Sequence, residues 1–271
     1  MTTEQIGRGR TSDVFAYGED RAIKLFPDSE DRAGIEQEAA AATLIHELGV
    51  PSVRCDGLAE VDGKLGIVFE RLDGISFNDV AEADLRQFGQ VCRDLADCHV
   101  RMHAAHTREL PDIRELALAL LDAAPLDQLS QAERTALAEH LKGLPEGDSV
   151  LHLDYHPQNV FRHRDGWAVI DWHSACRGPA AADVAMSALM MSEVELFPGT
   201  PPLKLLLYQI VRGLMRRLYL ARYFATTEIT AAEVDVWMTC ARVLRLGLLN
   251  VESERTRLLR RVQKVLKVIP A

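Results

Sequence analysis

The chain has 271 residues, of which 48% are hydrophobic and 26% are charged, which is typical of a folded globular protein and excludes wholesale disorder. At roughly 100–200 residues per domain, this length predicts one large domain or two lobes packed together. The net charge of −9 argues against a nucleic-acid-binding protein, because neutralising phosphates requires a basic face. An acidic chain is compatible with a cationic substrate without requiring one.

Short apolar runs separated by turn residues dominate the first about 70 residues and predict β-strands over 13–17, 21–26, 53–58 and 64–69. A typical hairpin pair, Asp-Gly, precedes the last of these strands. Residues 28–48 change to a helical period with a block of alanines, so we expect one helix between the second and third strands.

The character of the chain changes after Leu72. Leucine and alanine at helical spacing predict helices over 85–102, 113–121 and 132–141, and a loop-rich region follows over 149–179. From residue 181 to the end the pattern is helical again, with breaks near 197–202 and 226–230. This outline predicts a small α+β lobe over residues 1–72 and a larger, mainly helical lobe over residues 73–271.

The five cysteines give information about the cellular compartment. They are odd in number, widely spaced and without a C-x-x-C pair. We therefore expect neither a disulfide framework nor a zinc site, and a reducing cytoplasm fits best. The first residues carry no basic region and no apolar run, and basic residues interrupt the apolar stretch 203–224. We expect a cytoplasmic protein without a signal peptide, a membrane-spanning helix or a stable membrane association.

The strongest chemical signal is the segment His152-Leu153-Asp154-Tyr155-His156-Pro157-Gln158-Asn159, followed by a strand that ends at Asp171. An Asp, an Asn and a second Asp at this spacing supply oxygen donors of the kind that Mg²⁺ prefers. Phosphoryl transfer needs one carboxylate for the alcohol proton, and an Asn and an Asp for the metal. The His-x-Asp-x4-Asn spacing matches a kinase catalytic loop, although a capped turn would use the same residue types.

The N-terminal segment adds two supporting features. Residues 7–14 read G-x-G-x-x-S-x-V, in which glycines allow the backbone to approach phosphates closely. Ser12 stands where a third glycine is expected, so this pattern alone is weak. Lys24 ends an Arg-Ala-Ile-Lys strand and precedes a helix that carries Glu36 and Glu38, either of which is a candidate partner; we favour Glu38.

Taken together, these segments resemble the aminoglycoside phosphotransferase and choline kinase group of small-molecule kinases, which share the protein-kinase-like fold. The resemblance rests on the catalytic segment from His152 to Asn159, with its His-Pro pair, and on Ile-Asp-Trp at residues 170–172. It continues to Asp183, which closes an element resembling Gly-Asp-Pro-x-x-Asp, although the first Asp of that element is missing. The implied fold is α+β and two-lobed, with a small antiparallel-sheet lobe carrying one helix and a larger helical lobe.

The resemblance implies roles for individual residues. Asp154 would be the catalytic base, Asn159 and Asp171 would hold Mg²⁺, and Lys24 with Glu38 would position the phosphates of ATP or GTP.

Further nucleotide contacts are implied around the glycine-rich turn and the end of the small lobe. The turn formed by Gly7, Gly9, Ser12 and Val14 would cover the nucleotide, and the backbone of Glu70 and Leu72 would contact the adenine as a hinge. Asp183 would anchor the catalytic loop.

The sequence departs from the family pattern at several positions. Leu153 replaces a small residue, and His173 stands where the family often has Glu or Gly; this histidine is either a supporting group beside Asp171 or a surface residue. Few residues separate Asp171 from the next helix, so a protein-kinase activation segment has little room.

The expected activity is therefore phosphorylation of a small-molecule hydroxyl group, on an antibiotic such as an aminoglycoside or on a metabolic alcohol, amino alcohol or sugar. A catalytically silent nucleotide-binding protein is the alternative of a different class, and a protein kinase is a less favoured one. Four acidic residues of the helical lobe are candidates for binding an amine, or are surface charges: Glu193, Glu195, Glu233 and Asp235. The basic amphipathic stretch 255–267 is expected to be a docked helix rather than a membrane-binding one.

Overall fold

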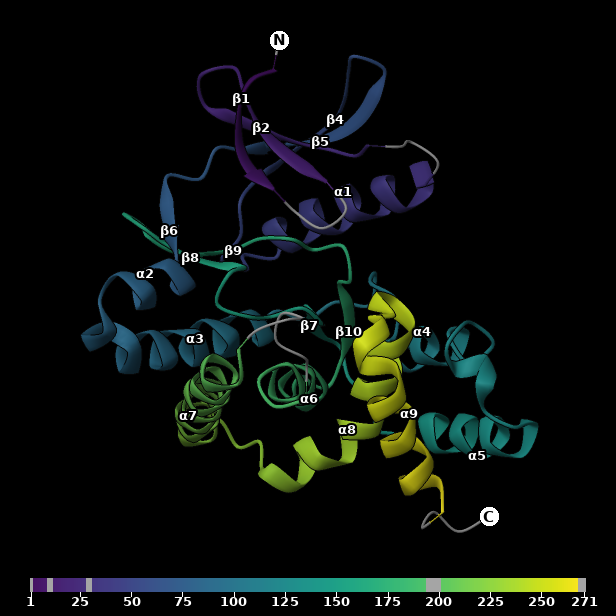
Figure 1. Ribbon diagram of the computed structural model, residues 1–271. Helices are drawn as coiled ribbons and strands as arrows, with labels where there is room; N and C mark the ends of the chain where they lie inside the picture. The colour runs from purple at the N-terminus through teal and green to yellow at the C-terminus, as the bar shows by residue number, and fades with distance from the viewer. Residues whose placement is uncertain (1, 9–11, 28–30, 194–200, 268–271) are drawn as a thin grey trace. The chain divides into compact units, whose positions relative to one another are not determined.

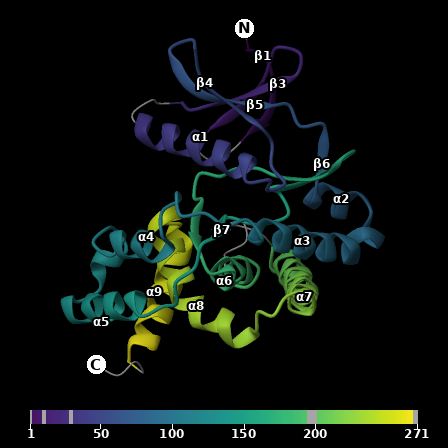
Figure 2. The same ribbon diagram turned by 180° about the vertical axis from the view of Figure 1, so that it is seen from behind.

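The computed structural model of the protein describes residues 2–8, 12–27, 31–193 and 201–267 (Figure 1). The chain divides into two compact units, which are described separately. The first unit comprises Met1–Leu85 and Pro157–Ala175, and the second comprises Arg86–His156 and Cys176–Ala271. Figure 2 shows the same elements from behind.

An antiparallel five-stranded sheet in the order β1-β2-β3-β5-β4 forms the base of the first unit. Its strands are β1 (Thr2–Arg8), β2 (Asp13–Tyr17), β3 (Arg21–Leu25), β4 (Cys55–Val61) and β5 (Lys64–Glu70). Helix α1 (Arg32–Glu47) packs against β4 and β5, as both ribbon views show. Asp31 caps this helix by accepting a hydrogen bond from the Gly34 N–H at 2.9 Å.

A second, three-stranded sheet completes the first unit, in the order β6-β8-β9. It contains β6 (Gly74–Ser76), β8 (Val160–His163) and β9 (Gly166–Val169), and β6 leads into α2 (Phe77–Ala83). The Val169 N–H donates to the Pro51 carbonyl at 2.8 Å, which ties β9 to the segment after α1. The first unit therefore extends past the lobe boundary expected at residue 72 and includes a segment that lies far along the chain.

Helices build most of the second unit: α3 (Phe88–His103), α4 (Ile113–Ala119), α5 (Gln131–Lys142), α6 (Ala180–Met190), α7 (Pro202–Thr226), α8 (Ala231–Leu244) and α9 (Glu252–Leu266). Two short strands, β7 (Ser149–Leu151) and β10 (Cys176–Gly178), pair antiparallel. Helix α6 is buried from Ala181 to Met190 and lies at the centre of this unit, while α7 packs along α3. Short helical turns are η2 (Leu85–Gln87), η3 (Leu126–Gln128) and the π-helical η4 (Arg245–Leu249).

Most predicted elements are present, and their ends follow local chemistry. The predicted hairpin turn is confirmed, since Asp62 and Gly63 have φ values of 51° and 76° between β4 and β5. The capping boxes Ser130/Glu133 and Thr230/Glu233 start α5 and α8.

Sequence patterns missed some elements of the fold. Strands β1 and β6 were not predicted, and neither was the interruption at η4, after which Asn250 has a φ of 45°. At Gly247 a Cβ atom would come within 2.7 Å of Leu120, so the close approach of Leu120 favours glycine at this position. The expected break near 197–202 falls partly outside the described residues.

The predicted combination of a small antiparallel sheet carrying a packed helix with a larger helical part is confirmed. The C-terminal basic helix is docked, as expected, because Leu258 and Val262 of α9 are both 0% exposed. Among the residues that the structure describes, no helix combines the length and the apolar character needed to cross a membrane.

Candidate active site

A lysine between two carboxylates forms the polar centre of the first unit. Lys24 on β3 places its Nζ 2.7 Å from Glu38 Oε1 on α1 and 2.8 Å from Asp171 Oδ1, just after β9. The Lys24 side chain is only 12% exposed. Burial lowers the pKa of the Lys24 ammonium, but the charges of Asp171 and Glu38 outweigh burial and hold that pKa above its ordinary value. Lys24 is therefore a fixed cation.

The choice between Glu36 and Glu38 follows from the phase of α1. Glu38 is 6% exposed and points to the sheet, whereas Glu36 bonds Arg32 at 3.3 Å on the exposed side of the same helix. Residues two apart on a helix lie on different faces, so only one of the two can contact Lys24. The structure pairs Lys24 with Glu38.

Asp171 also contacts His173, whose Nδ1 lies 3.1 Å from Asp171 Oδ1. Burial lowers the pKa of the His173 imidazole, but its hydrogen bond to Asp171 and the charge of that carboxylate raise the pKa above its ordinary value overall. Burial likewise raises the pKa of Asp171, yet His173 and Lys24 hold it well below its usual range. His173 is thus a supporting group beside Asp171, one of the two roles considered from the sequence.

The backbone brings Asn159 close to the same region. The Ile170 N–H donates to the Asn159 carbonyl at 3.0 Å, and Val160 pairs with Val169 where β8 meets β9. Asp171 has a φ of 69°, a left-handed conformation that is unusual for a residue other than glycine and that redirects the chain after the strand. An ionised carboxylate and an amide on adjoining strand ends form a donor set that fits Mg²⁺.

The predicted nucleotide-covering residues lie on the first two strands and on β5. Gly7 pairs with Val14 across β1 and β2, and Val14 in turn pairs with Lys24. Ser12 is 6% exposed, and Gly9 lies outside the described residues.

Glu70 ends β5, and its N–H donates to the Arg54 carbonyl at 2.9 Å. Leu72 follows in the connection to β6.

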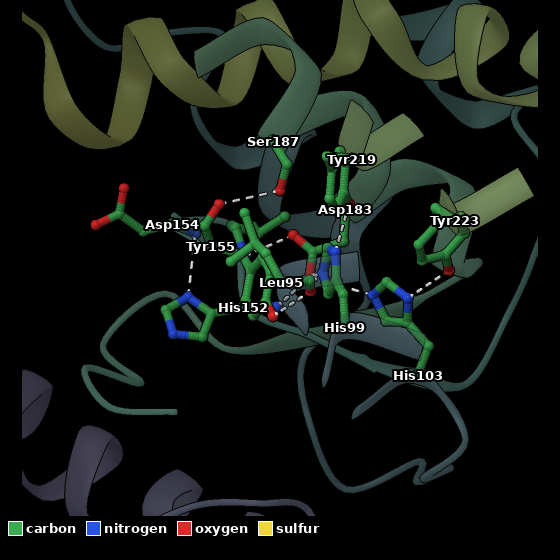
Figure 3. A network of polar contacts seen from close by, with 11 residues as sticks. Leu95, His99, His103, His152, Asp154, Tyr155, Asp183, Ser187, Tyr219 and Tyr223 are labelled. Carbon is green, nitrogen blue, oxygen red and sulfur yellow. Dashed lines mark hydrogen bonds and ion pairs between the residues drawn. The ribbon is translucent and has the colours of Figure 1, made fainter. Parts of the chain in front are cut away.

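In the second unit, the carboxylate of Asp183 is a buried acceptor for the loop before Asp154 (Figure 3). Its Oδ2 accepts the His152 N–H at 2.6 Å, and its Oδ1 accepts the Leu153 N–H at 2.9 Å. Leu153 has a φ of 61°, so these bonds hold the backbone in a left-handed turn just before Asp154.

Two histidines one turn apart on α3 complete the shell of Asp183. The Nε2 atoms of His99 and His103 lie 3.2 and 3.4 Å from Asp183 Oδ2. Their Nδ1 atoms lie 2.6 and 2.7 Å from the hydroxyls of Tyr219 and Tyr223, which are one turn apart on α7. Figure 3 shows this chain of contacts from α7 through α3 to α6. In the following text these five residues are called the Asp183 network.

Electrostatics in the Asp183 network differ from those around Lys24. Burial lowers the pKa of His99 to about 3, so this imidazole is neutral at physiological pH. Burial raises the pKa of Asp183, but the hydrogen bonds from His103 and His99 outweigh it and hold that pKa well below its usual range.

Asp154 sits in a loop whose neighbours are fixed. Its N–H donates to His152 Nδ1 at 3.2 Å, and its Oδ2 lies 3.5 Å from His156 Nε2. The Tyr155 hydroxyl donates to the Leu95 carbonyl at 2.7 Å, and Ser187 Oγ donates to the Tyr155 carbonyl at 3.1 Å. The Asp154 carboxylate points away from the Asp183 network in Figure 3, and 18% of its side chain is exposed. Asp154 therefore presents a partly exposed carboxylate from a loop with a fixed backbone.

The structure thus groups Lys24, Glu38, Asn159 and Asp171 in the first unit and assigns Asp154 to the second. Sequence reasoning missed His99, His103, Tyr219 and Tyr223. The signal in the sequence is a shared spacing. The two histidines are four residues apart and so are the two tyrosines, and each histidine contacts the tyrosine 120 positions later.

The acidic candidates for binding an amine have other partners. Glu193 is 7% exposed and contacts Arg242 at 2.7 Å and Arg261 at 3.3 Å, so its charge is already neutralised. Glu233 caps α8, Asp235 is exposed on the same helix, and Glu195 lies outside the described residues.

Comparison with known proteins gives one family match. The model of the phosphotransferase enzyme family matches residues 2–229. No curated protein matches the chain in sequence.

Solved structures share the fold at low sequence identity. The choline kinase LicA from Streptococcus pneumoniae is 15% identical with a TM-score of 0.60, and the match covers 98% of this chain and 93% of that one. The ternary complex of streptomycin, ATP and APH(2")-IIa is 11% identical with a TM-score of 0.54, over 97% and 91% of the two chains. The GDP complex of aminoglycoside 2'-phosphotransferase-IIIa is 12% identical with a TM-score of 0.51, over 97% and 92%.

Proposed function

The chain belongs to the phosphotransferase enzyme family, and from this premise we propose that it transfers the γ-phosphoryl group of ATP to a hydroxyl group of a small molecule. The observation that carries the proposal is the placement of Lys24 between Glu38 and Asp171, at 2.7 and 2.8 Å. A fixed lysine held by a helix glutamate beside a metal-binding aspartate is what phosphate positioning requires.

The first unit would bind the nucleotide. Lys24 would contact the α- and β-phosphates, and the turn that contains Gly7, Ser12 and Val14 would cover them. The Glu70 N–H is engaged by Arg54, so Glu70 would contact the adenine through its carbonyl, and Leu72 through its backbone. The ternary complex named above contains ATP and another relative contains GDP, so either purine triphosphate is a candidate donor.

Asn159 and Asp171 would hold Mg²⁺. The metal would neutralise charge on the β- and γ-phosphates when bound. His173 would orient the Asp171 carboxylate by donating to the same oxygen that Lys24 contacts. Its imidazole would keep that carboxylate ionised and fixed when Lys24 moves to a phosphate.

Asp154 would orient the acceptor hydroxyl and accept its proton. The carboxylate is reachable, and the flanking residues His152, Leu153 and Tyr155 are pinned to α6 and α3, so the loop loses little freedom when substrate binds. Positioning and charge stabilisation would supply most of the rate enhancement.

The acceptor is proposed only as a hydroxylated small molecule. The relatives are named for choline and for aminoglycosides, which carry both hydroxyl and amine groups. In this chain Glu193 is neutralised by arginines and Glu233 caps a helix, so neither supports recognition of an amine. A neutral alcohol is therefore as suitable a candidate as a cationic one.

The test is release of ADP or GDP from the Mg²⁺ complex of each nucleotide, across aminoglycosides, macrolides, amino alcohols and sugars. Asp154→Ala should lower turnover by roughly a hundred- to ten-thousandfold. Asp148→Ala, which removes a half-exposed aspartate near the start of β7, is the matched control and should retain turnover.

A hit that both variants retain would remove Asp154 from the mechanism. Nucleotide binding without turnover on any acceptor would favour the catalytically silent alternative.

A further inference from the structure

A stripe of large apolar side chains is exposed on the first three turns of α7. Leu203 is 80% exposed, Ile210 is 59% exposed and Leu214 is 46% exposed. Leu206 and Leu207, at 54% and 57%, complete the set, which we call the α7 stripe. The spacing of three and four residues places all five on one side of the helix. Scattered exposed leucines are ordinary, but a contiguous set marks an interaction surface.

The internal contacts of α7 lie on its opposite side. Tyr219 and Tyr223 are both 0% exposed and bond His99 and His103 of α3. Tyr219 lies half a turn around the helix from Ile210, so the side that packs on α3 is used within the unit and the α7 stripe is not. The two sides of α7 therefore serve different contacts.

Charge on α7 differs in sign from that of the whole chain. The sequence of α7 contains no Asp or Glu, although the net charge of the protein is −9. Lys204 and Arg217 are exposed beside or at the end of the α7 stripe. A helix with an exposed apolar side bordered by basic residues has the pattern of a helix that lies in the interface of an anionic membrane.

A second copy of the chain is less well suited to cover this surface. In an antiparallel pair of α7 helices, Lys204 would face the region of Arg217 of the other copy. In a parallel pair, each basic residue would face its equivalent. Both arrangements place like charges together, which disfavours self-pairing.

Helix α9 provides an internal comparison. It is also basic and amphipathic, but Leu258 and Val262 are 0% exposed because its apolar side is packed within the unit. The expectation of no stable membrane association considered that helix and membrane-crossing segments, and the exposed side of α7 is a different feature.

We propose that the α7 stripe and its basic neighbours dock the protein onto the surface of an anionic lipid bilayer, with α7 lying along the surface. The leucines and Ile210 would enter the boundary between headgroups and acyl chains. Lys204 and Arg217 would contact anionic headgroups. This inference does not depend on the proposed phosphotransferase activity.

The experiment is flotation of the full-length protein with two kinds of vesicle, without nucleotide or acceptor. One kind is phosphatidylcholine, and the other contains phosphatidylcholine and phosphatidylglycerol in equal parts. We expect binding to the anionic vesicles, weakened by added salt, and little binding to the neutral ones.

Variants separate the apolar from the charged contribution. Leu207→Gln combined with Ile210→Gln should lower vesicle binding by about tenfold or more, and so should Lys204→Gln combined with Arg217→Gln. Leu85→Gln, at a leucine that is 79% exposed outside α7, is the matched control and should bind like the unaltered protein. Circular dichroism and thermal melting show whether each variant remains folded, as expected for exposed positions.

Three results would overturn the proposal. They are absence of binding to the anionic vesicles, equal loss in the Leu85→Gln control, and unchanged binding in both α7 variants. Sedimentation velocity adds a fourth: a dimer that the Leu207/Ile210 variant converts to monomers, without vesicle binding, would assign the α7 stripe to a second copy.

Discussion

Asp171 and Asp183 are both held ionised, but the groups around them differ in charge and in burial. Asp171 is 35% exposed at its side chain and contacts the Lys24 ammonium and the His173 imidazole. Asp183 is 0% exposed and accepts two backbone N–H groups and contacts two imidazoles, of which His99 is neutral.

This difference separates a chemical role from a structural one. Lys24 and His173 are side chains on separate elements, so Asp171 can exchange a partner for a metal without disturbing the fold. Every contact of Asp183 belongs to the packed interior, where losing a partner leaves a buried polar group unsatisfied. Four predictions test this comparison, from the largest expected effect to the smallest.

Asp171→Asn should lower phosphotransferase activity by roughly a hundred- to a thousandfold, because it removes the charge proposed to hold Mg²⁺. The loss of stability should be smaller than for Asp183→Asn, because the side chain is partly exposed, Lys24 keeps its ion pair with Glu38, and Asn tolerates the positive φ of this position. Steady-state kinetics and urea unfolding of the same preparation measure both quantities. Retained affinity for the Mg²⁺ complex of ATP would contradict the metal assignment.

Asp183→Asn should instead lower the free energy of unfolding by about 3 kcal/mol, because one oxygen of the carboxylate becomes an amino group facing N–H donors. Urea unfolding is the measurement. If this variant kept its stability and lost only turnover, Asp183 would have a chemical role like the one proposed for Asp171, and not a structural one.

Lowering the pH should change the contributions of His99 and His173 to folding stability in opposite directions. Burial lowers the folded pKa of His99 from 6.5 to about 3, so its stabilising contribution is present above pH 6.5 and is lost as the pH falls toward 3. This linkage predicts a loss of about 2 kcal/mol between about pH 7 and about pH 5.

His173 has a raised pKa, so its contribution is present below the ordinary value of 6.5 and is lost as the pH rises through the folded pKa. Titration of the imidazole NMR signals of His99 and His173 measures the two pKa values. An ordinary pKa at His99 would contradict a neutral His99 imidazole in the Asp183 network.

Tyr223→Phe should cost about 1 kcal/mol of stability, because His103 Nδ1 loses its hydroxyl partner in a buried site. Tyr208→Phe, on the exposed part of the same helix, should change stability by far less. Thermal melting of the two variants measures the difference. Equal melting temperatures would indicate that the tyrosine hydroxyls contribute nothing to the Asp183 network.

Local sequence predicted the elements that depend on local chemistry. The strands predicted over 13–17 and 64–69 and the turn at Asp62 follow from short apolar runs and from a turn pair with positive φ. The boundary of the first unit was not predictable in this way, because β6 pairs with β8, which lies far along the chain. Helix η4 also escaped prediction, because it depends on the contact of Gly247 with Leu120.

The sequence by itself determined the class of chemistry, that of a small-molecule phosphotransferase. It selected Lys24, Asp154, Asn159 and Asp171 as candidate residues from motif spacing, because a phosphoryl-transfer loop needs those side chain types in that order. Only the tertiary structure decided the partners. It selected Glu38 over Glu36 through the phase of α1, placed His173 against Asp171, and gathered two histidines and two tyrosines around Asp183. It also left the apolar side of α7 exposed. Spacing along a chain records which groups are available, whereas burial and partner choice depend on which faces of separate helices and strands pack together.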